Sequence, residues 1–465
     1  MELDQVHCLV EPNYMEKFQD YNLETACFLQ GEDPISRNTI PEDEILDNEN
    51  LKRFRVSASP GSSLEKELIS PGMVQATEKA EGDSPKGLQE ELIEEISVTD
   101  LLVMGAEAVE AQNWVLSSAI VAKLNSLLSD GENGDNHFNR LALFFSQGLF
   151  YKSIGTPDMF QEPFAKETDI SPTFQVLQEL SPYVKFAHFT ANQAVLEATE
   201  GDQEIHVTDF DIMEGIQWPP LMVDLASRKN VVSLRVTAII TDQKNSIFVQ
   251  QTGRRLKEFA DSIHFPFIFD HLVMVSDNDF ESINAGHTLI ANCMMHQLHM
   301  HKRNLSQVKT FIDGVTKLSP KILILVGEEL FSFTITPSMS FMEFFCEALH
   351  HYTAVSDSTV ISFCKDHEVG LRWIEKEFLG IRILENLSQF PSANEEKMQW
   401  GKRFDCLREF KPITLSSCNI SKAKFLVSLF RGGYWVQNEK WKLTLCWKSR
   451  PLTTTSIWVP ISTSR

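Results

Sequence analysis

The sequence lacks paired cysteines and long apolar runs. Its eight cysteines include no Cys-x-x-Cys pair, which disfavours a disulfide framework and a structural zinc site, so we expect reduced thiols. No apolar run approaches the roughly 18 to 20 residues that cross a bilayer. The acidic opening also lacks the basic-then-apolar order of a secretory signal. These absences predict a soluble intracellular protein.

Positive charge is also scarce. The chain of 465 residues has 42 Lys and Arg against 64 Asp and Glu, a net charge of −22. Such a chain repels phosphate backbones unless a local basic patch overrides the average field. The composition therefore disfavours tight DNA binding by this protein alone. A hydrophobic content of 43% excludes a chain that is disordered throughout.

The negative charge is concentrated at the front of the chain. Residues 1–98 hold 22 acidic and 8 basic residues. Between Asp33 and Gly87, Pro, Ser, Gly and Glu predominate, and few apolar positions recur with a regular period. Such a composition cannot bury enough apolar surface to offset its conformational entropy. We therefore predict an acidic, largely disordered region over 1–96 and one folded domain over 97–460.

The folded domain opens with a helical pattern. Apolar residues at helical spacing predict a helix over 101–128, which Ser97 or Thr99 can cap. A turn rich in Gly, Asp and Asn separates it from a second helix over 140–151. We therefore expect a helical cap over 97–155.

An LxxLL sequence lies near the end of the first predicted helix. Its leucines are Leu124, Leu127 and Leu128. On an exposed helix these side chains can enter a partner's hydrophobic groove. The same leucines can instead face the core of their own domain, and the sequence leaves both interpretations open.

From about residue 205 the pattern changes to short apolar runs that alternate with helical stretches. The predicted strands span 205–210, 234–240, 267–273, 288–291 and 322–326, and two antiparallel strands are predicted at 434–436 and 443–448. The predicted helices span 218–226, 253–262, 305–318 and 341–352. This alternation predicts an α/β fold, a mainly parallel sheet with helices on both faces.

The turn after the first predicted strand has a single glycine, Gly215. A dinucleotide or S-adenosylmethionine site generally needs several glycines so that the backbone can approach the ligand, but Ile212, Met213 and Ile216 fill those places. We therefore expect no cofactor. The sequence also has no nucleophile elbow, phosphate loop or His-Glu-x-x-His helix, so we predict no catalytic residues and no enzymatic activity.

Two clusters of titratable residues could carry chemistry. His296, His299 and His301 stand close together, and imidazoles can bind zinc. No fourth ligand has suitable spacing, so we favour hydrogen-bonded histidines and expect no metal. Glu328 and Glu329 follow an apolar strand, but no partner acid or base identifies a mechanism.

The end of the first predicted strand has an unusual sequence. Asp209 is followed by Gln217, Trp218 and two prolines, Pro219 and Pro220. Prolines suit the first turn of a helix, where missing N–H groups cost nothing. We predict a rigid turn in which the carboxylate accepts backbone N–H bonds at the start of the next helix.

Tryptophans and cations are interleaved near the end of the chain. They include Trp435, Trp441, Trp447 and Trp458, with Lys440, Lys442 and Lys448 among them. Such a pattern can stack nucleic-acid bases, and the lysines would then contact DNA. It can equally form a cross-strand hydrophobic layer with snorkelling lysines, which is the interpretation we favour.

These motifs together resemble a known family. The stretch IHVTDFDIMEGIQWPPL, residues 205–221, resembles the VHIID motif of the plant GRAS family of transcriptional regulators. All of the motif's hallmark residues are present, namely His206, Asp209, Gln217, Trp218, Pro219 and Leu221. The likeness extends over 97–458.

The other family segments occur in the family's order. They are a first leucine-rich region within 97–155, the VHIID-like region 189–230, a second leucine-rich region 245–305, a PFYRE-like region 320–390 and a SAW-like region 400–460. The residues that we single out in the last region are Gly433, Tyr434, Trp447, Ser456 and Trp458. Residues 374–388 and 445–452 are most similar to the nodulation-signalling pathway 2 branch.

The resemblance implies a fold and a function. Family members have a Rossmann-type, methyltransferase-like sheet with an α-helical cap and generally lack enzymatic activity. The resemblance implies a nuclear co-regulator in root symbiosis that pairs with another GRAS protein, or with itself, and reaches promoter DNA mainly through the partner. It implicates Leu124, Leu127 and Leu128 in this pairing. It also implies that the protein binds no membrane and no small-molecule substrate. Direct DNA binding and a methyltransferase-like enzyme are the alternatives.

The sequence departs from the family pattern at three places. Thr208 adds a hydroxyl where an apolar residue is usual, which is tolerable if the hydroxyl bonds locally. An Arg-Glu pair of the PFYRE region appears as Ile381-Arg382, which puts any salt bridge built on that pair in doubt. Ile457 replaces an alanine and needs room for a larger side chain.

Overall fold

The structure is a computed structural model that describes most of the chain from residue 97 to residue 461. The described ranges are 97–129, 136–154, 177–178, 181–210, 212, 214–230, 232–284, 286, 288–294, 305–330, 339–362, 368–390, 407–430 and 432–461. The predicted disordered region 1–96 lies outside them.

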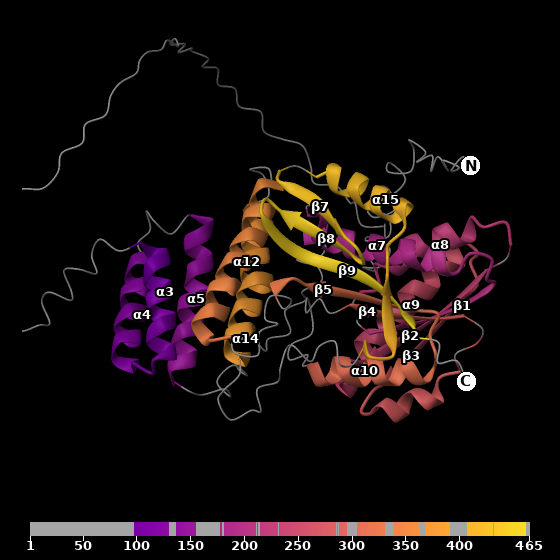
Figure 1. Ribbon diagram of the computed structural model, residues 1–465, viewed down its shortest axis with the longest axis horizontal. Coiled ribbons are helices and arrows are strands. Elements are labelled where there is room, and N and C mark those ends of the chain that lie inside the picture. Colours follow the sequence, from indigo (N-terminus) through magenta and orange to yellow (C-terminus); the bar gives the residue numbers. More distant parts are fainter. Residues whose placement is uncertain are drawn as a thin grey trace, which may run out of the picture. The chain divides into compact units, whose positions relative to one another are not determined.

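Three helices at the start of the described chain pack side by side and form the helical cap (Figure 1). They are α3 (Val98–Glu110), α4 (Trp114–Ser129) and α5 (His137–Ile154). Ser97 caps α3, because its hydroxyl accepts a hydrogen bond from the backbone N–H of Asp100 at 3.2 Å. Of the two capping residues considered above, the structure selects Ser97.

The single helix predicted over 101–128 is wrong, because the chain breaks between α3 and α4. Gln112 has a φ of 56°, a left-handed conformation that cannot continue a right-handed helix. The side chain of Asn113 then starts α4 by accepting a bond from the backbone N–H of Leu116 at 3.2 Å. The apolar period continues across the break, which is why it hid the boundary.

The strands form one sheet in the order β3-β2-β1-β4-β5-β9-β8-β7, with β6 paired to β9. Their bounds are β1 (Glu204–Asp209), β2 (Ser233–Ile240), β3 (Phe267–Val273), β4 (Thr288–Met294), β5 (Ile322–Glu328), β6 (Phe410–Ile413), β7 (Tyr434–Glu439), β8 (Lys442–Trp447) and β9 (Arg450–Pro460). Strands β1 to β5 are parallel, and β9 runs antiparallel beside β5. The order of the parallel strands is the Rossmann-type order, which confirms the predicted fold class.

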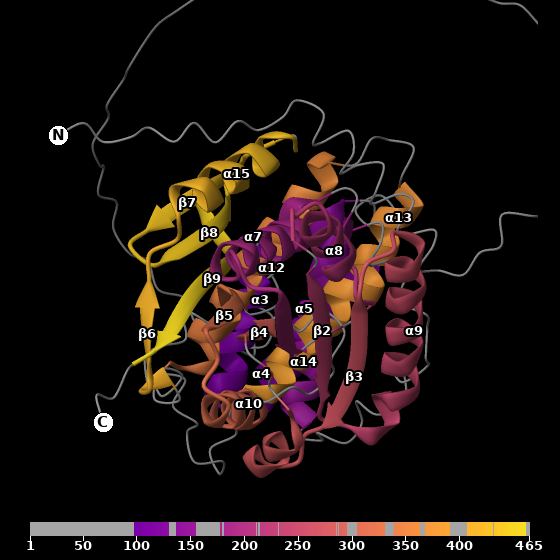
Figure 2. The same ribbon diagram turned by 90° about the vertical axis from the view of Figure 1, so that its right-hand side faces the viewer.

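Helices cover both faces of the sheet (Figures 1 and 2). One face packs against α7 (Pro182–Ala198), α8 (Trp218–Ala226), α9 (Ser246–Ser262) and α15 (Ser417–Ser428). The other packs against α10 (Leu305–Lys317) and the 3₁₀ helix η3 (Asp277–Ser282). In β5, Ile322 and Ile324 belong to the first core and Leu323 and Leu325 to the second. Successive side chains of a strand point to opposite faces of the sheet. The continuous apolar run of β5 therefore contributes side chains to both cores.

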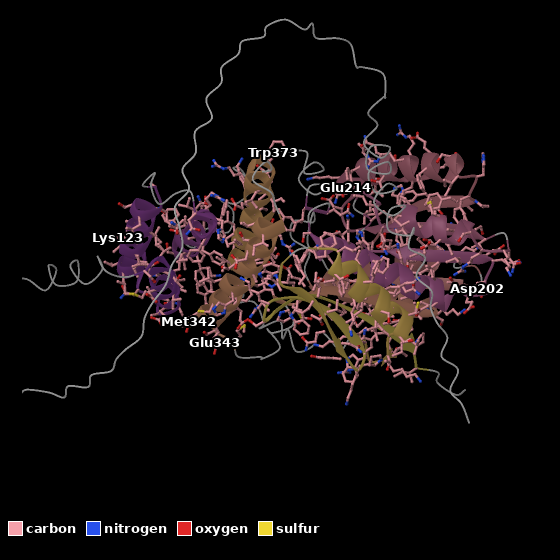
Figure 3. All side chains as sticks on the ribbon, turned by 90° about the horizontal axis from the view of Figure 1, so that it is seen from above. Lys123, Asp202, Glu214, Met342, Glu343 and Trp373 are labelled. Carbon is pink, nitrogen blue, oxygen red and sulfur yellow. The ribbon has the colours of Figure 1, made fainter. Side chains whose placement is uncertain are left out.

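Helices from the middle of the chain join the cap to the sheet. They are α12 (Phe341–Ser362), α13 (Glu368–Trp373), a π-helical segment (Ile374–Gly380) and α14 (Ile381–Gln389). Helix α12 packs against α3 and β9, and α14 packs against α5. At the start of α12 the backbone N–H of Met342, labelled in Figure 3, donates to the Glu110 carboxylate of α3 at 2.7 Å. The cap therefore rests on α12 and α14.

Helix α7 is an element that the sequence pattern did not predict. Most of its residues are buried, so it lacks the polar face on which a helical period depends. The long final strand β9 was also missed, because it follows β8 after a tight turn. The predicted bounds of β3 and α8 agree with the structure, whereas α9 begins at Ser246 and α12 extends to Ser362.

Candidate functional site

A buried polar network lies at the carboxyl end of β1. The Asp209 carboxylate accepts hydrogen bonds at 2.9 Å from the Trp218 indole Nε1 and from Asn292 Nδ2. Asp209 and Asn292 are register partners on β1 and β4, and Trp218 is the fully buried first residue of α8. Two side-chain donors therefore bond this carboxylate. The sequence analysis predicted backbone N–H donors from the next helix and did not predict these side chains.

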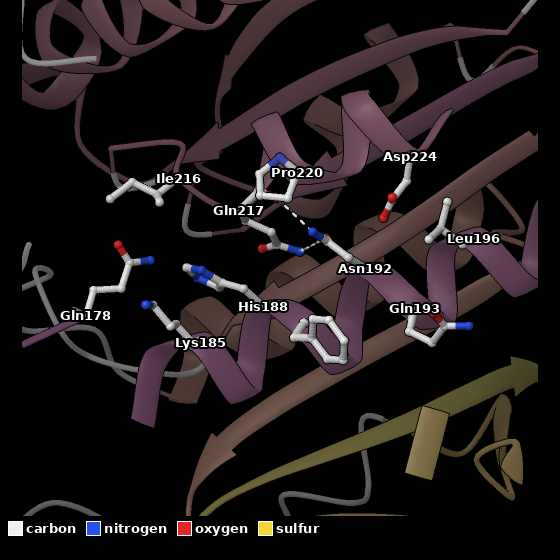
Figure 4. A pocket seen from close by; sticks show the side chains of 11 residues that line it. Gln178, Lys185, His188, Asn192, Gln193, Leu196, Ile216, Gln217, Pro220 and Asp224 are labelled. Atoms are coloured by element: carbon white, nitrogen blue, oxygen red, sulfur yellow. Dashed lines mark hydrogen bonds between the residues drawn. The ribbon is translucent and has the colours of Figure 1, made fainter. Parts of the chain in front are cut away.

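Gln217 extends this network to α7. Its Oε1 accepts from Asn292 Nδ2 at 3.2 Å, and its Nε2 donates to Asn192 Oδ1 at 3.1 Å. Asn192 Nδ2 in turn donates to the backbone carbonyl of Gln217 at 2.8 Å, a bond drawn in Figure 4. The Gln217 amide thus accepts a bond from β4 and donates one to α7. Because Gln217 directly precedes α8, these bonds fix the positions of α7, α8 and β4 relative to one another.

The network occupies the crevice in which folds of this type bind ligands. The strand order reverses between β1 and β4, and ligands bind outside the carboxyl ends of the strands at such a point. Gly215 has a φ of +78°, and a Cβ there would lie 2.9 Å from side-chain atoms of Thr252 and Leu256. This glycine therefore serves close packing against α9. The residues present do not form the glycine-rich cradle that a dinucleotide needs.

The remaining hallmark residues of the VHIID-like motif are buried. The imidazole of His206 shares a 2.8 Å hydrogen bond with the Thr237 hydroxyl on β2. Thr208 is fully buried, and its hydroxyl donates to a carbonyl of β4 at 3.4 Å, so this departure is accommodated by a local bond. Pro219 and Leu221 are buried at the start of α8. All these positions build the interior of the domain.

A second buried cluster lies where β5 meets α12 and α14. One carboxylate oxygen of Glu328 bonds His351 Nε2 at 2.6 Å, and the other accepts from the guanidinium of Arg382. The exposed fraction of each of these three side chains is 4% or less. Arg382 belongs to the Ile381-Arg382 departure described above. Arg382 therefore forms a salt bridge with Glu328 of β5. The family's Arg-Glu pair is absent at this position.

Tyrosines complete this cluster. Burial, followed by the nearby Glu328 carboxylate, raises the pKa of Tyr183 and of Tyr352. Asn386 Nδ2 donates to the Tyr352 hydroxyl. Burial opposes the charge of Arg382, but the attraction of Glu328 outweighs it and raises the pKa of Arg382. At neutral pH the tyrosines are therefore protonated and the arginine is charged, an arrangement that links β5 with three helices.

The leucines of the LxxLL sequence lie largely inside the cap. Leu124 is completely buried, Leu128 is 3% exposed, and Leu127 is half-buried. A buried side chain cannot enter a partner's groove unless α4 separates from its neighbours. For Leu124 and Leu128 the structure therefore favours the core interpretation, so a role in pairing would be indirect. A role in partner binding stays a prediction.

The same helices expose apolar side chains that the sequence pattern does not single out. Trp114 and Val115 begin α4 with exposed fractions of 44% and 84%. Phe150 and Ile154 lie in the last turns of α5 and are 45% and 41% exposed. Helices α4 and α5 are consecutive in the chain and pack against each other, an antiparallel arrangement that places the start of α4 near the end of α5. We call these four side chains the cap patch.

The four tryptophans of the C-terminal sheet divide into two pairs. Trp447 and Trp458 are buried, and the Trp447 ring meets Tyr434 edge-on at a centroid distance of 4.6 Å. Trp435 and Trp441 are 45% and 44% exposed. The predicted hydrophobic layer therefore exists for the first pair, and the second pair remains available to a partner.

The predicted DNA-contacting lysines lie beside the exposed tryptophans. Lys442 pairs with Glu439 at 3.2 Å, and Lys448 lies 3.5 Å from Asp357. Lys440 stands over the Trp441 ring at 5.9 Å. Two of the three cations thus have an acidic partner, which weakens the local positive field.

The other SAW-like residues hold the C-terminal sheet together. The carbonyl of Gly433 accepts a bond from the backbone N–H of Lys448 at 2.9 Å. The Ser456 hydroxyl accepts from the Trp458 indole at 3.0 Å. Ile457 is 4% exposed and packs into the main core, so the larger side chain at this departure has room.

The described residues offer no obvious metal or membrane site. Within them, no group of three or more His, Cys, Asp or Glu could hold a metal ion. His296, His299 and His301 lie outside the described residues. None of the helices that the structure describes has the length and apolar character needed to cross a bilayer. The described cysteines, Cys293, Cys346, Cys418 and Cys446, form no disulfide.

The match to a family model covers nearly the whole described chain. The model of the GRAS domain family matches residues 98–459. The chain belongs to the GRAS domain family. It is 36% identical to the protein NODULATION SIGNALING PATHWAY 2 of Medicago truncatula, over 81% of this chain and 77% of that protein. The protein of the same name from Lotus japonicus is 35% identical, over 79% of this chain and 77% of that protein.

A solved GRAS structure has the same fold. The crystal structure of SCL7 from Oryza sativa is 25% identical, with a TM-score of 0.62, and the match covers 78% of this chain and 99% of that one. Asp209, Trp218 and the cap patch all lie within the residues that the family model matches.

Proposed function

We propose that this protein is a nuclear transcriptional co-regulator in root symbiotic signalling. It pairs with another GRAS protein, or with a second copy of itself, and promoter DNA is contacted mainly by the partner. The family match over residues 98–459, with two NODULATION SIGNALING PATHWAY 2 relatives, carries the proposal. A net charge of −22 supports dependence on a partner for DNA binding.

The β1–β4 crevice supports a binding role rather than catalysis. Asp209, Trp218 and Asn292 occupy it with bonds to one another. The titratable groups of the second cluster are buried and bonded among themselves, so no acid or base among them faces a substrate. The domain thus offers surfaces for other macromolecules.

The cap patch is the contact surface that we propose for pairing. Large apolar side chains are seldom left exposed together, and aromatic residues dominate binding energy at interfaces. Trp114 and Phe150 supply two such rings beside the highly exposed Val115. Leu124 and Leu128 are buried in the same helix, so replacing them would weaken pairing by destabilising α4 and not by removing a direct contact.

Light scattering on size-exclusion fractions tests the pairing. The full chain is mixed with a DNA-binding GRAS protein, each at about 10 μM, a concentration that detects micromolar dissociation constants. We expect a complex of the summed mass. Val115→Lys should abolish it, because a lysine would place a charge within an apolar contact. Trp114→Ala should weaken it about tenfold or more.

Val275→Lys is the matched control, because Val275 is 85% exposed and Val115 is 84% exposed. It lies beside η3, away from the cap helices in sequence and structure. If the Val115→Lys and Val275→Lys variants form the complex equally well, the cap patch is not the contact surface. The absence of any complex with the unaltered chain would exclude pairing with that partner, and a mobility shift of promoter DNA by this chain alone would favour direct binding.

A further inference from the structure

Strand β3 forms one border of the sheet (Figure 2). Among the residues that the structure describes, it pairs only with β2, in a register that runs without a shift over Phe267–Val273. Every residue of β3 is exposed or half-buried, whereas every residue of β4 and β5 is buried. The outer edge of β3 is therefore accessible along the whole strand.

Alternate residues of β3 direct their backbone groups away from β2. Just before the strand, the Pro266 carbonyl accepts a bond from β2 at 3.0 Å, and just after it the Met274 N–H donates one to β2 at 2.7 Å. In a parallel pair every second residue bonds the neighbour, so the even-numbered residues face β2. The odd-numbered residues direct their N–H and C=O groups outward, and these groups have no hydrogen-bond partner within the described ranges. We call them the four outward residues: Phe267, Phe269, His271 and Val273.

An open edge of this kind is a template for another extended chain. Proteins usually block such edges with lysines, prolines or bulges. Strand β3 contains no Lys, Pro or Gly, and its one carboxylate is Asp270. The other border strand, β7, ends at Glu439 and is followed by Lys440, charges of the kind that block pairing. A row of unpaired N–H and C=O groups is matched only by an extended backbone, so the occupant of the β3 edge is a strand.

Pairing with a second copy of β3 is disfavoured. An antiparallel pair that bonds all four outward residues must centre on Asp270, because the register then joins Phe267 to Val273 and Phe269 to His271. The two Asp270 residues would face each other with Cα atoms about 4.5 Å apart. Like charges directly opposite each other destabilise a sheet. The occupant therefore has a different sequence from β3.

Asp270 also indicates the charge of the occupant. Its Oδ2 accepts a bond from Arg235 Nε at 2.7 Å, but its Oδ1 has no partner in the part of the chain that the structure describes. The side chain is 41% exposed, so a Lys or Arg on the added strand can reach it. The net charge of −22 attracts basic segments as well. On the same face, Ile268 is 55% exposed and favours a β-branched neighbour.

We propose that the outer edge of β3 binds an extended, basic segment of a partner protein, which adds a strand to the sheet. The backbone of the segment pairs with the four outward residues, and its Lys or Arg faces Asp270. This contact goes beyond pairing through the cap patch and does not depend on it, because α4 and α5 contribute nothing to the β3 edge.

Hydrogen exchange at single residues of the full chain tests whether the edge is open. Without a partner, the amides of the four outward residues should exchange at least about tenfold faster than those of Ile268, Asp270 and Leu272, which are bonded to β2. Equal protection of both sets would mean that the edge is already covered and would overturn the proposal. Protection that rises with protein concentration would assign the edge to a second copy.

The probe is a fluorescent peptide of about nine residues in which Thr and Val alternate around a central Lys, a length that spans β3. We expect a dissociation constant below about 100 μM by fluorescence anisotropy. The bound peptide should slow exchange of the four outward amides about tenfold or more. The same peptide with a central Glu should bind about tenfold more weakly, because it meets Asp270 with a like charge. N-methylation of every peptide residue should abolish binding, because it removes the backbone donors.

Variants of the chain locate the contact. Ile268→Lys should weaken peptide binding about tenfold or more, because a lysine beside the edge blocks pairing and repels a basic segment. Ile361→Lys on α12 is the matched control, since Ile361 is 49% exposed and Ile268 is 55% exposed. Asp270→Asn should remove the preference for the Lys peptide over the Glu peptide, and it keeps the test valid if Ile268→Lys unfolds the chain, which circular dichroism checks.

Three further results would overturn the proposal. Equal binding by Ile268→Lys and Ile361→Lys would place the peptide elsewhere. Equal affinity for the N-methylated peptide would exclude strand addition. Equal affinity of the unaltered chain for the Lys and Glu peptides would remove the basic residue from the assignment.

Discussion

At the scale of single residues, the bond from the Trp218 indole to the Asp209 carboxylate can be isolated. Trp218→Phe removes the donor and leaves a buried carboxylate with one bond fewer. We expect the free energy of unfolding to fall by about 2 to 3 kcal/mol, as for bonds to charged groups. Urea unfolding followed by circular dichroism measures the change.

Trp447→Phe is the control for this substitution. Trp447 is 1% exposed, and its indole Nε1 has no hydrogen-bond partner among the described residues. The control therefore removes similar buried volume without breaking a bond. If both substitutions lower the free energy of unfolding equally, the Asp209 bond contributes nothing measurable.

His188 makes a second prediction at the residue scale. Its pKa of about 4 in the folded chain lies below its ordinary value of 6.5. Between these values the unfolded chain binds more protons, so the free energy of unfolding should fall as the pH drops from 6.5 toward 4. His188→Gln should reduce this loss between pH 7 and pH 5, measured by urea unfolding at each pH. An unchanged pH dependence would show that the imidazole is freely hydrated.

At the scale of elements, α4 both completes the cap core and displays the cap patch. Leu124→Ala should lower the free energy of unfolding by about 2 to 5 kcal/mol, because it opens a cavity at a fully buried position. Leu127→Ala should cost less, because this side chain is half-buried. Chemical denaturation of both variants checks the order. A larger loss at Leu127 would show that α4 faces its neighbours differently.

At the scale of the whole molecule, charge governs contact with DNA. Neutralising each phosphate contact changes the slope of log affinity against log salt by about 0.9. We expect the pair of GRAS proteins to show the same slope as the DNA-binding partner alone, measured by fluorescence anisotropy of labelled promoter DNA. Charge reversal at Lys440, Lys442 and Lys448 should leave the slope unchanged. A reduction of the slope would show that this chain touches DNA itself.

Several structural features could be predicted from local patterns. The parallel strands and α8 follow from apolar runs and turn residues, because these signals lie within a few positions of one another. The family follows from motifs such as residues 205–221. The break at Gln112 could not be predicted in this way, because the apolar period continues through it. Helix α7 was missed because both of its sides are buried, which removes the two-faced pattern.

The candidate sites depended more on the tertiary structure. Asp209, Gln217 and Trp218 were singled out in the sequence, but their partner Asn292 stands 83 positions after Asp209 and lies in a β-strand that gives no sign of it. The cap patch was not predicted. It consists of residues whose exposure is decided only when the helices have packed.

The sequence by itself determined the α/β class, the family, and the concentration of negative charge at the front of the chain, since these rest on composition, period and motif. Only the tertiary structure decided which side chains are available to partners. It buried Leu124 and Leu128, exposed Val115, and joined Arg382 to Glu328 across 54 positions. The physical reason is that burial and pairing are properties of neighbours in space, which local sequence patterns do not specify.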